Sequence, residues 1–210
     1  MADRQTGSVW THYDGSVLTG PLAEDDIQLG HVPLVHTTWV EWKAERPESL
    51  VLDQYDEYQN QYARMAGLGI GDAWFGQQFR DSLLHEDDRL DPTEIVLGAG
   101  IGSETRAYVL ADLPSELSAL PDELAGHAIV VFTEPSSLYG LAFSAVVDGE
   151  VLEFEVEDGR IVDSAGTTWD RSGLATDGPL SGTQLQHVTS FVSEWYGWVA
   201  FYPETTIYQA

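Results

Sequence analysis

The middle of the chain consists of short apolar runs separated by turn residues, a pattern typical of an antiparallel sheet. Runs rich in β-branched and aromatic residues predict strands at 95–97, 105–110, 128–133, 140–147, 151–156 and 160–162. The dipeptides Asp148-Gly149 and Asp158-Gly159 separate neighbouring runs and favour two-residue hairpin turns. Because these runs do not alternate with helical segments, the pattern does not indicate a parallel α/β sheet.

Helical periodicity occurs between the N-terminal stretch and the sheet-rich middle. Tyr55, Tyr58, Tyr62 and Met65 lie at helical spacing, which predicts an amphipathic helix over 54–66. The glycines that follow this helix are expected to end it. Residues 72–91 contain several large apolar side chains and are expected to form either a second helix or an ordered loop.

Two stretches near the ends of the chain present rare residues in the same order. The first has Trp10, Gly20-Pro21-Leu22, Trp39, Trp42 and Pro47, and the second has Trp169, Gly178-Pro179-Leu180, Trp195, Trp198 and Pro203. The distance between matched residues drifts only from 159 to 156 positions, so few insertions or deletions separate the stretches. We therefore predict two related units, 3–52 and 163–208, which flank a sheet-rich middle at 93–162.

Each predicted unit contains the same local elements. A tight hairpin comes first, and a further strand, a short helix and a closing strand follow it, the further strands at 29–35 and 185–188 and the closing strands at 50–52 and 206–208. In the first unit, Thr38 and Glu41 have the spacing of a helix capping box.

In both predicted helices two tryptophans lie three positions apart and so share one helix face. Such a pair could form a stacking platform for a ligand, but helical spacing of large apolar residues favours core packing. Together these patterns predict an α+β fold that is mainly β, with an antiparallel sheet, short helices and a single compact domain over 1–210.

The excess of acidic residues indicates the salt conditions in which the protein works more than it indicates the fold. Acidic residues number 35 and basic residues nine, which gives a formal charge of −26, and Lys43 is the single lysine. This self-repulsion destabilises a compact chain in dilute buffer, whereas molar salt shortens the Debye length to about 3 Å. The composition therefore predicts a protein of an extreme halophile, with an acidic protein from ordinary salt as the alternative. The same charge argues against nucleic acid and anionic lipid as partners.

The residue types and apolar runs that the sequence lacks exclude several kinds of site and a membrane-spanning helix. The chain has no cysteine, which excludes disulfides, thiolate nucleophiles and Cys-ligated zinc or iron–sulfur sites. No apolar run approaches the roughly 20 residues of a membrane-spanning helix, so no membrane span is expected. No secretory signal precedes Asp3, and the chain as it stands therefore predicts a cytoplasmic location.

A glycine-rich run invites comparison with a dinucleotide-binding loop. Gly98-Ala99-Gly100-Ile101-Gly102 follows an apolar strand, but its third glycine comes one position early. The next residues favour a strand where phosphate binding needs a helix N-terminus. We therefore expect no nucleotide cofactor, and no Walker loop, nucleophile elbow or His-Glu-x-x-His motif is present.

Histidines and carboxylates leave metal binding open. His31 and His187 occupy matched positions in the two units, and His85, Glu86 and Asp88 belong to the densest cluster of nitrogen and oxygen ligands. These five residues are the candidate metal ligands, with a hard cation or salt ions at the cluster. Core-satisfied histidines and a solvated acidic loop are the alternative interpretation. No acid–base pair can be selected from 35 carboxylates, so catalytic residues stay unassigned and an enzyme is not favoured.

Several segments resemble one protein family. Asp-Arg-Gln-Thr-Gly-Ser-Val-Trp at 3–10, Gly20-Pro21-Leu22 and the Trp-x-x-Trp-x-x-x-x-Pro helix are similar to the family known as domain of unknown function 3179. The runs at 88–92 and 195–203 are similar to its later part. Members are commonly exported or lipid-anchored, so the resemblance implies an extracytoplasmic role if a true start lies upstream. Longer relatives place another strand-rich half there, and this chain is expected to be a natural short form or part of such a protein.

Three function hypotheses follow. The leading one is a non-enzymatic binding or structural module in a halophile. The second is a metal-dependent hydrolase that uses carboxylates with His85, or with His31 and His187. The third, an accessory to an extracytoplasmic redox or transport system, rests on the family resemblance alone. A small molecule, another protein or a second copy of the chain are the open alternatives for a partner.

We expect the melting temperature to rise steeply when KCl is raised from millimolar to molar concentration, because salt screens the repulsion among the acidic side chains. Scanning calorimetry at several KCl concentrations measures this. A melting temperature that stays constant over that range would contradict the halophilic interpretation.

Overall fold

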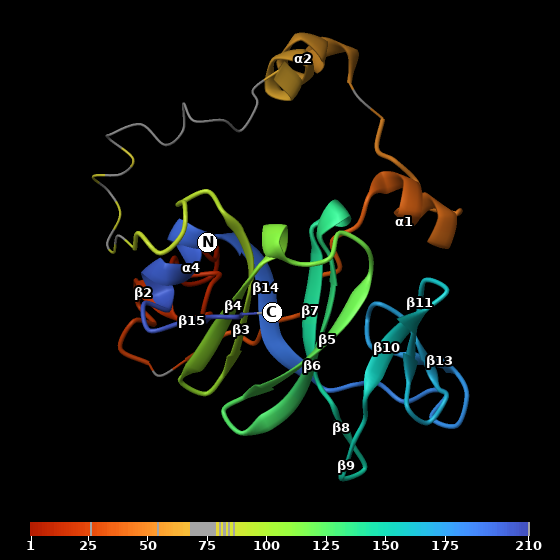
Figure 1. Ribbon diagram of the computed structural model, residues 1–210. Helices are drawn as coiled ribbons and strands as arrows, with labels where there is room; N and C mark the ends of the chain where they lie inside the picture. The colour runs from red at the N-terminus through yellow and green to blue at the C-terminus, as the bar shows by residue number, and fades with distance from the viewer. Residues whose placement is uncertain are drawn as a thin grey trace.

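A curled seven-stranded sheet forms the centre of the molecule, in the order β15-β4-β3-β14-β7-β6-β5 (Figure 1). The computed structural model describes residues 1–25, 27–53, 55–67, 79, 81, 83, 85 and 87–209. The sheet strands are β3 (Ile95–Ile101), β4 (Glu104–Val109), β5 (Ser118–Leu124), β6 (His127–Glu134), β7 (Tyr139–Ser144), β14 (His187–Glu194) and β15 (Thr206–Ile207). All neighbours are antiparallel except β15 and β4. The mainly-β, antiparallel fold class is therefore confirmed.

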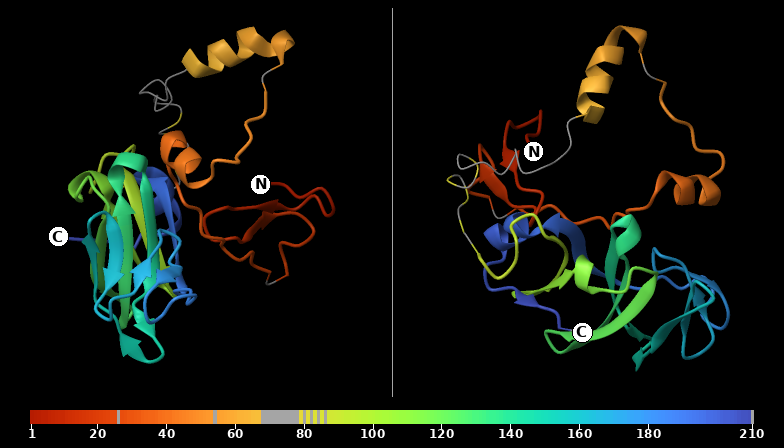
Figure 2. Two further views of the ribbon diagram at one scale, coloured as in Figure 1. Left: turned by 90° about the vertical axis from the view of Figure 1, so that its right-hand side faces the viewer. Right: turned by 45° about the horizontal axis from the view of Figure 1, so that its top comes forward.

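Smaller sheets and short helices surround this sheet. A four-stranded antiparallel sheet contains β10 (Phe154–Glu157), β11 (Arg160–Asp163), β12 (Thr168–Trp169) and β13 (Ala175–Asp177). Two hairpins pair β1 (Val9–Trp10) with β2 (Val17–Thr19) and β8 (Val146–Val147) with β9 (Glu150–Val151). The helices are α1 (Trp39–Glu45), α2 (Gln59–Gly67) and α4 (Trp195–Phe201). Figure 2 shows that α1 and α2 project from the sheets, whereas α4 lies against them.

Turn chemistry fixes the hairpins that the sequence predicts. Asp148 and Asp158 have φ angles of 52° and 49°, and the glycine after each also has a positive φ. Both residues of the turn are thus in the left-handed region, as the primed turns of two-residue hairpins require. These turns pair β8 with β9 and β10 with β11.

One strand was not predicted, and another is longer than predicted. β5 escaped prediction because it contains Pro121 and two acidic residues, and an edge strand tolerates them since one of its edges has no partner. β14 runs over eight residues, beyond the short strand expected at 185–188.

The helix expected at 54–66 starts later, as α2 after a 3₁₀ turn at Asp56–Tyr58. Most of 72–91 lies outside the described residues.

The glycine run of β3 has a packing role. Gly98 lies under the ring of Trp198 on α4, and a Cβ at this position would overlap the ring. Trp195 and Trp198 are fully buried together with Val96, Ala107 and Val109 of β3 and β4. The helix α4 therefore completes the core on this side of the sheet, as predicted for its tryptophans.

The two ends of the chain share one local arrangement. Asp3 accepts backbone N–H bonds within its turn and a 3.0 Å bond from the indole Nε1 of Trp10. Asp163 accepts the equivalent bonds in its own turn and a 2.9 Å bond from Nε1 of Trp169. Short-range contacts of the first hairpin in each unit are thus alike.

Beyond the hairpins, the two stretches differ, so the repeat of whole units stays a prediction. Residues 29–35 and 50–52 form no strand, and these two strand predictions are wrong. Trp39 and Trp42 are 52% and 39% exposed, so their assignment to the core is also wrong. The capping box of Thr38 and Glu41 forms as predicted. Local interactions therefore build α1, but none of the sheets that the structure describes covers its tryptophans.

We expect Trp198→Ala to lower the free energy of unfolding by about 3–5 kcal/mol, since it empties a fully buried site. Trp42→Ala is expected to lower it by less than about 1 kcal/mol, because the ring is substantially exposed. Denaturant unfolding of both variants measures the difference. Equal losses in the two variants would contradict this assignment of their environments.

Candidate functional site

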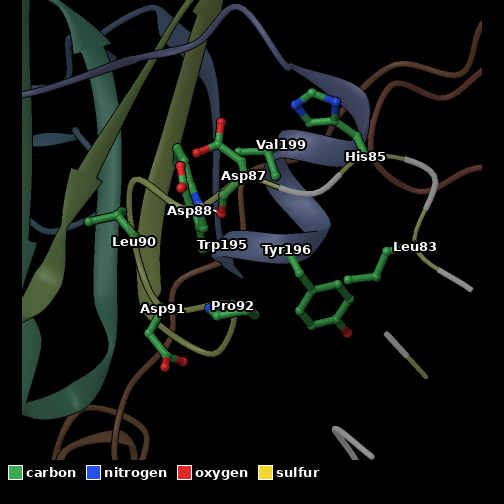
Figure 3. A pocket seen from close by; sticks show the side chains of 10 residues that line it. All are labelled: Leu83, His85, Asp87, Asp88, Leu90, Asp91, Pro92, Trp195, Tyr196 and Val199. Carbon is green, nitrogen blue, oxygen red and sulfur yellow. Dashed lines mark hydrogen bonds between the residues drawn. The ribbon is translucent and has the colours of Figure 1, made fainter. Parts of the chain in front are cut away.

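Two cavities lie beside α4, and the larger of them is where this helix meets the loop before β3. It has a volume of ≈ 840 Å³ and is lined by Leu83, His85, Asp87, Asp88, Leu90, Asp91, Pro92, Trp195, Tyr196 and Val199 (Figure 3). The lining combines apolar side chains with three carboxylates and one imidazole. Its chemistry is therefore that of an acidic, partly aromatic binding cavity.

Two hydrogen bonds and one ion pair hold the cavity wall in place. The backbone N–H of Trp195 donates to the Glu94 carbonyl at 2.8 Å, which ties the start of α4 to the loop. Arg89 forms an ion pair with Asp87 at 2.6 Å, and its guanidinium stacks over the Trp195 ring at 5.1 Å. Arg89 also donates a 2.7 Å bond to the Thr205 carbonyl. The loop is thus fastened both to α4 and to the segment that leads into β15.

The Arg89 ion pair changes the electrostatics of the cavity. Its guanidinium lowers the pKa of Asp87, chiefly through their hydrogen bond. Burial raises the pKa of Tyr196, so this hydroxyl stays protonated near neutral pH. Since Arg89 already neutralises Asp87, that carboxylate is occupied by a structural contact.

Metal binding at the predicted acidic cluster stays a prediction. His85 and Asp88 both line the cavity, and Glu86 lies outside the described residues. Figure 3 places His85 and Asp91 at opposite ends of the lining. No group of three or more metal-binding side chains comes together within the described part of the chain.

The other two candidate ligands, His31 and His187, do lie near each other. The pKa of His187 is lowered, mainly by burial and further by the charge of His31. His187 Nε2 is 3.1 Å from Ser190 Oγ, and His31 Nε2 is 2.7 Å from the Tyr13 carbonyl. His31 also stacks on Phe191 of β14 and lines the smaller cavity, of ≈ 330 Å³. Both imidazoles therefore have partners within the protein, and this pair lacks a third ligand among the described residues.

A feature that the sequence interpretation missed is an exposed apolar segment, residues 31–52. Large hydrophobic side chains stand exposed along it, namely Val32, Leu34, Val35, Trp39, Val40, Trp42, Leu50, Val51 and Leu52. Arg171 fastens this segment to the remainder through Glu41 of α1 at 3.6 Å and Glu134 of β6 at 2.8 Å. The apolar residues of this segment are visible in the sequence, but their match to 187–208 predicts core packing.

The charged residues of α1 are themselves locally paired. Glu41 accepts bonds from the backbone N–H and the hydroxyl of Thr38, which lower its pKa to about 2. Lys43 donates to the carbonyls of Pro47 and Ser49. These bonds hold the shape of the helix while its apolar side chains face solvent.

No helix within the described ranges is long and apolar enough to cross a membrane.

We expect the free energy of unfolding to fall as pH is lowered from about 7.5 to about 5.5, starting near the ordinary histidine pKa of about 6.5. Half-buried His187 binds a proton less readily in the folded than in the unfolded protein, so protonation favours unfolding. Chemical denaturation across this pH range measures the slope, which His187→Gln should reduce. His127→Gln, at an exposed position, is the control, and an equal reduction in both variants would contradict the assignment.

Comparison with known proteins places the chain in a family. No match was found among curated proteins or among solved structures. The model of the family described as "Protein of unknown function (DUF3179)" matches residues 1–205. The resemblance seen in the Trp-rich segments is thereby confirmed over nearly the whole chain, and the chain belongs to the DUF3179 family.

Proposed function

We propose that this protein is a non-enzymatic docking module that binds a protein partner through the apolar segment. The observation that carries the proposal is the contrast between 31–52 and 187–208, which share a sequence pattern. Trp195 and Trp198 are fully buried, whereas Trp39 and Trp42 face solvent. An apolar surface of this kind is typical of an interaction site.

The energetics favour burial of the segment in a complex. Removing apolar surface from water gains roughly 25 cal/mol per Å², and aromatic side chains bury the largest areas. Leu50 and Leu52 are almost fully exposed at 96% and 84%. A partner that covers these side chains would remove their apolar surface from water.

The low net charge of the apolar segment also supports its binding to a protein partner. The chain as a whole carries −26, but the apolar segment contains three acidic and two basic residues, Glu41, Glu45, Glu48, Lys43 and Arg46, a net charge of −1. This segment is therefore nearly neutral within a strongly acidic protein. A partner meets less repulsion here than over the acidic surface.

A metal-dependent hydrolase is the second candidate, supported by the proximity of His31 and His187. It ranks lower because each imidazole is already hydrogen-bonded or stacked and the described residues provide no third ligand. Zinc titration by calorimetry tests it. Stoichiometric binding that is lost in His187→Gln would favour this candidate over the docking module.

Site-specific photo-crosslinking in host cells tests the docking function. A photoreactive residue at Leu34 is expected to form a defined protein adduct, because this side chain lies in the apolar segment. The same residue at Val151 of β9, which is also exposed, is the matched control. Equal crosslinking from both positions, or none from Leu34, would contradict the proposal.

A further inference from the structure

The backbone before α1 has no hydrogen-bonded neighbour within the described part of the chain. In residues 32–36, no backbone N–H or C=O forms a hydrogen bond to another residue that the structure describes. The matching segment, β14, pairs with β3 on one edge and with β7 on the other. The segment at 32–36 therefore has the sequence of a strand but lacks a neighbouring strand.

A proline limits which partner can pair with this segment. Pro33 stands where β14 has Thr189, the residue opposite Gly100 of β3. Because proline has no N–H to donate, it is confined to strands that are paired on one edge. The segment therefore fits a single strand neighbour better than the central position that β14 occupies.

Residues 39–46, which are α1 and its C-cap Arg46, contain two acidic and two basic residues, and this balance permits self-association. Two molecules of charge −26 repel each other across most of their surfaces. In an antiparallel approach of two α1 helices, the acidic Glu41 of each copy lies toward the basic end of the other, where Arg46 is found. This stretch is thus self-complementary in charge as well as apolar.

From these observations we propose that the occupant of the apolar segment is a second copy of this chain. The two 32–36 strands pair antiparallel about a two-fold axis, and exposed side chains that include Leu34, Trp39 and Trp42 are buried between the copies. A two-fold interface uses the same patch on both subunits and is the commonest symmetry of soluble oligomers. This inference rests on the proposed docking function and identifies its partner.

Light scattering on the purified full chain in molar KCl tests this, over protein concentrations from about 1 µM to about 100 µM. We expect a shift from monomer to dimer as the concentration rises. Leu34→Asp is expected to raise the dissociation constant more than about 10-fold, because it places an unpaired charge in the interface. Val151→Asp adds the same charge at an exposed position on β9 and should leave the dimer unchanged.

Hydrogen exchange of the amides at 32–36 distinguishes the outcomes. Protection that rises with dimer formation supports the strand pairing. A dimer that Leu34→Asp does not weaken overturns the proposal. A wild-type monomer with rapid exchange at 32–36 also overturns it, while leaving the segment open for a different protein. A wild-type monomer with protected amides overturns both the second-copy proposal and the docking function, since the segment would then be covered within one chain.

Discussion

The structure depends on the close approach of the Trp198 ring to β3. Gly98 provides the space for this ring, because any side chain there would occupy the same volume. Once the ring is seated, α4 lies against β3 and β4, and Nε1 of Trp198 donates a 3.0 Å bond to Thr205 just before β15. The position of the C-terminal edge strand is therefore linked to one aromatic–glycine contact in the interior of the sheet.

The same contact also positions the larger cavity. Trp195 is one turn before Trp198, so the burial of α4 presents its ring to Arg89 and its backbone to Glu94. The acidic loop is thereby held along the helix, and its carboxylates line the cavity as a consequence. Asp87 serves mainly to fix Arg89, so one carboxylate of this loop is already engaged by a guanidinium.

The first Trp-rich helix, α1, shows the outcome when the tryptophans have no packing site of this kind. Nε1 of Trp42 donates to Ser49 at 2.7 Å, which matches the bond between Trp198 and Thr205. Capping and indole bonds thus reproduce the local geometry of α4, because they involve only neighbours in sequence. The apolar side chains of α1 nevertheless stay exposed, since burial requires a surface from elsewhere. We regard this difference as the physical basis of a docking role.

The sequence alone determined the features that depend on short-range chemistry. These are the Asp-Gly turns, the capping box of Thr38 and Glu41, the alternating strands of the middle and the acidic charge. Only the tertiary structure decided which tryptophan pair is buried, because Trp42 and Trp198 share one local pattern but only Trp198 meets a glycine of β3. It also decided that His31 is within electrostatic reach of His187 and that His85 and Asp88 line one cavity, since such proximity depends on chain packing rather than on spacing in the sequence.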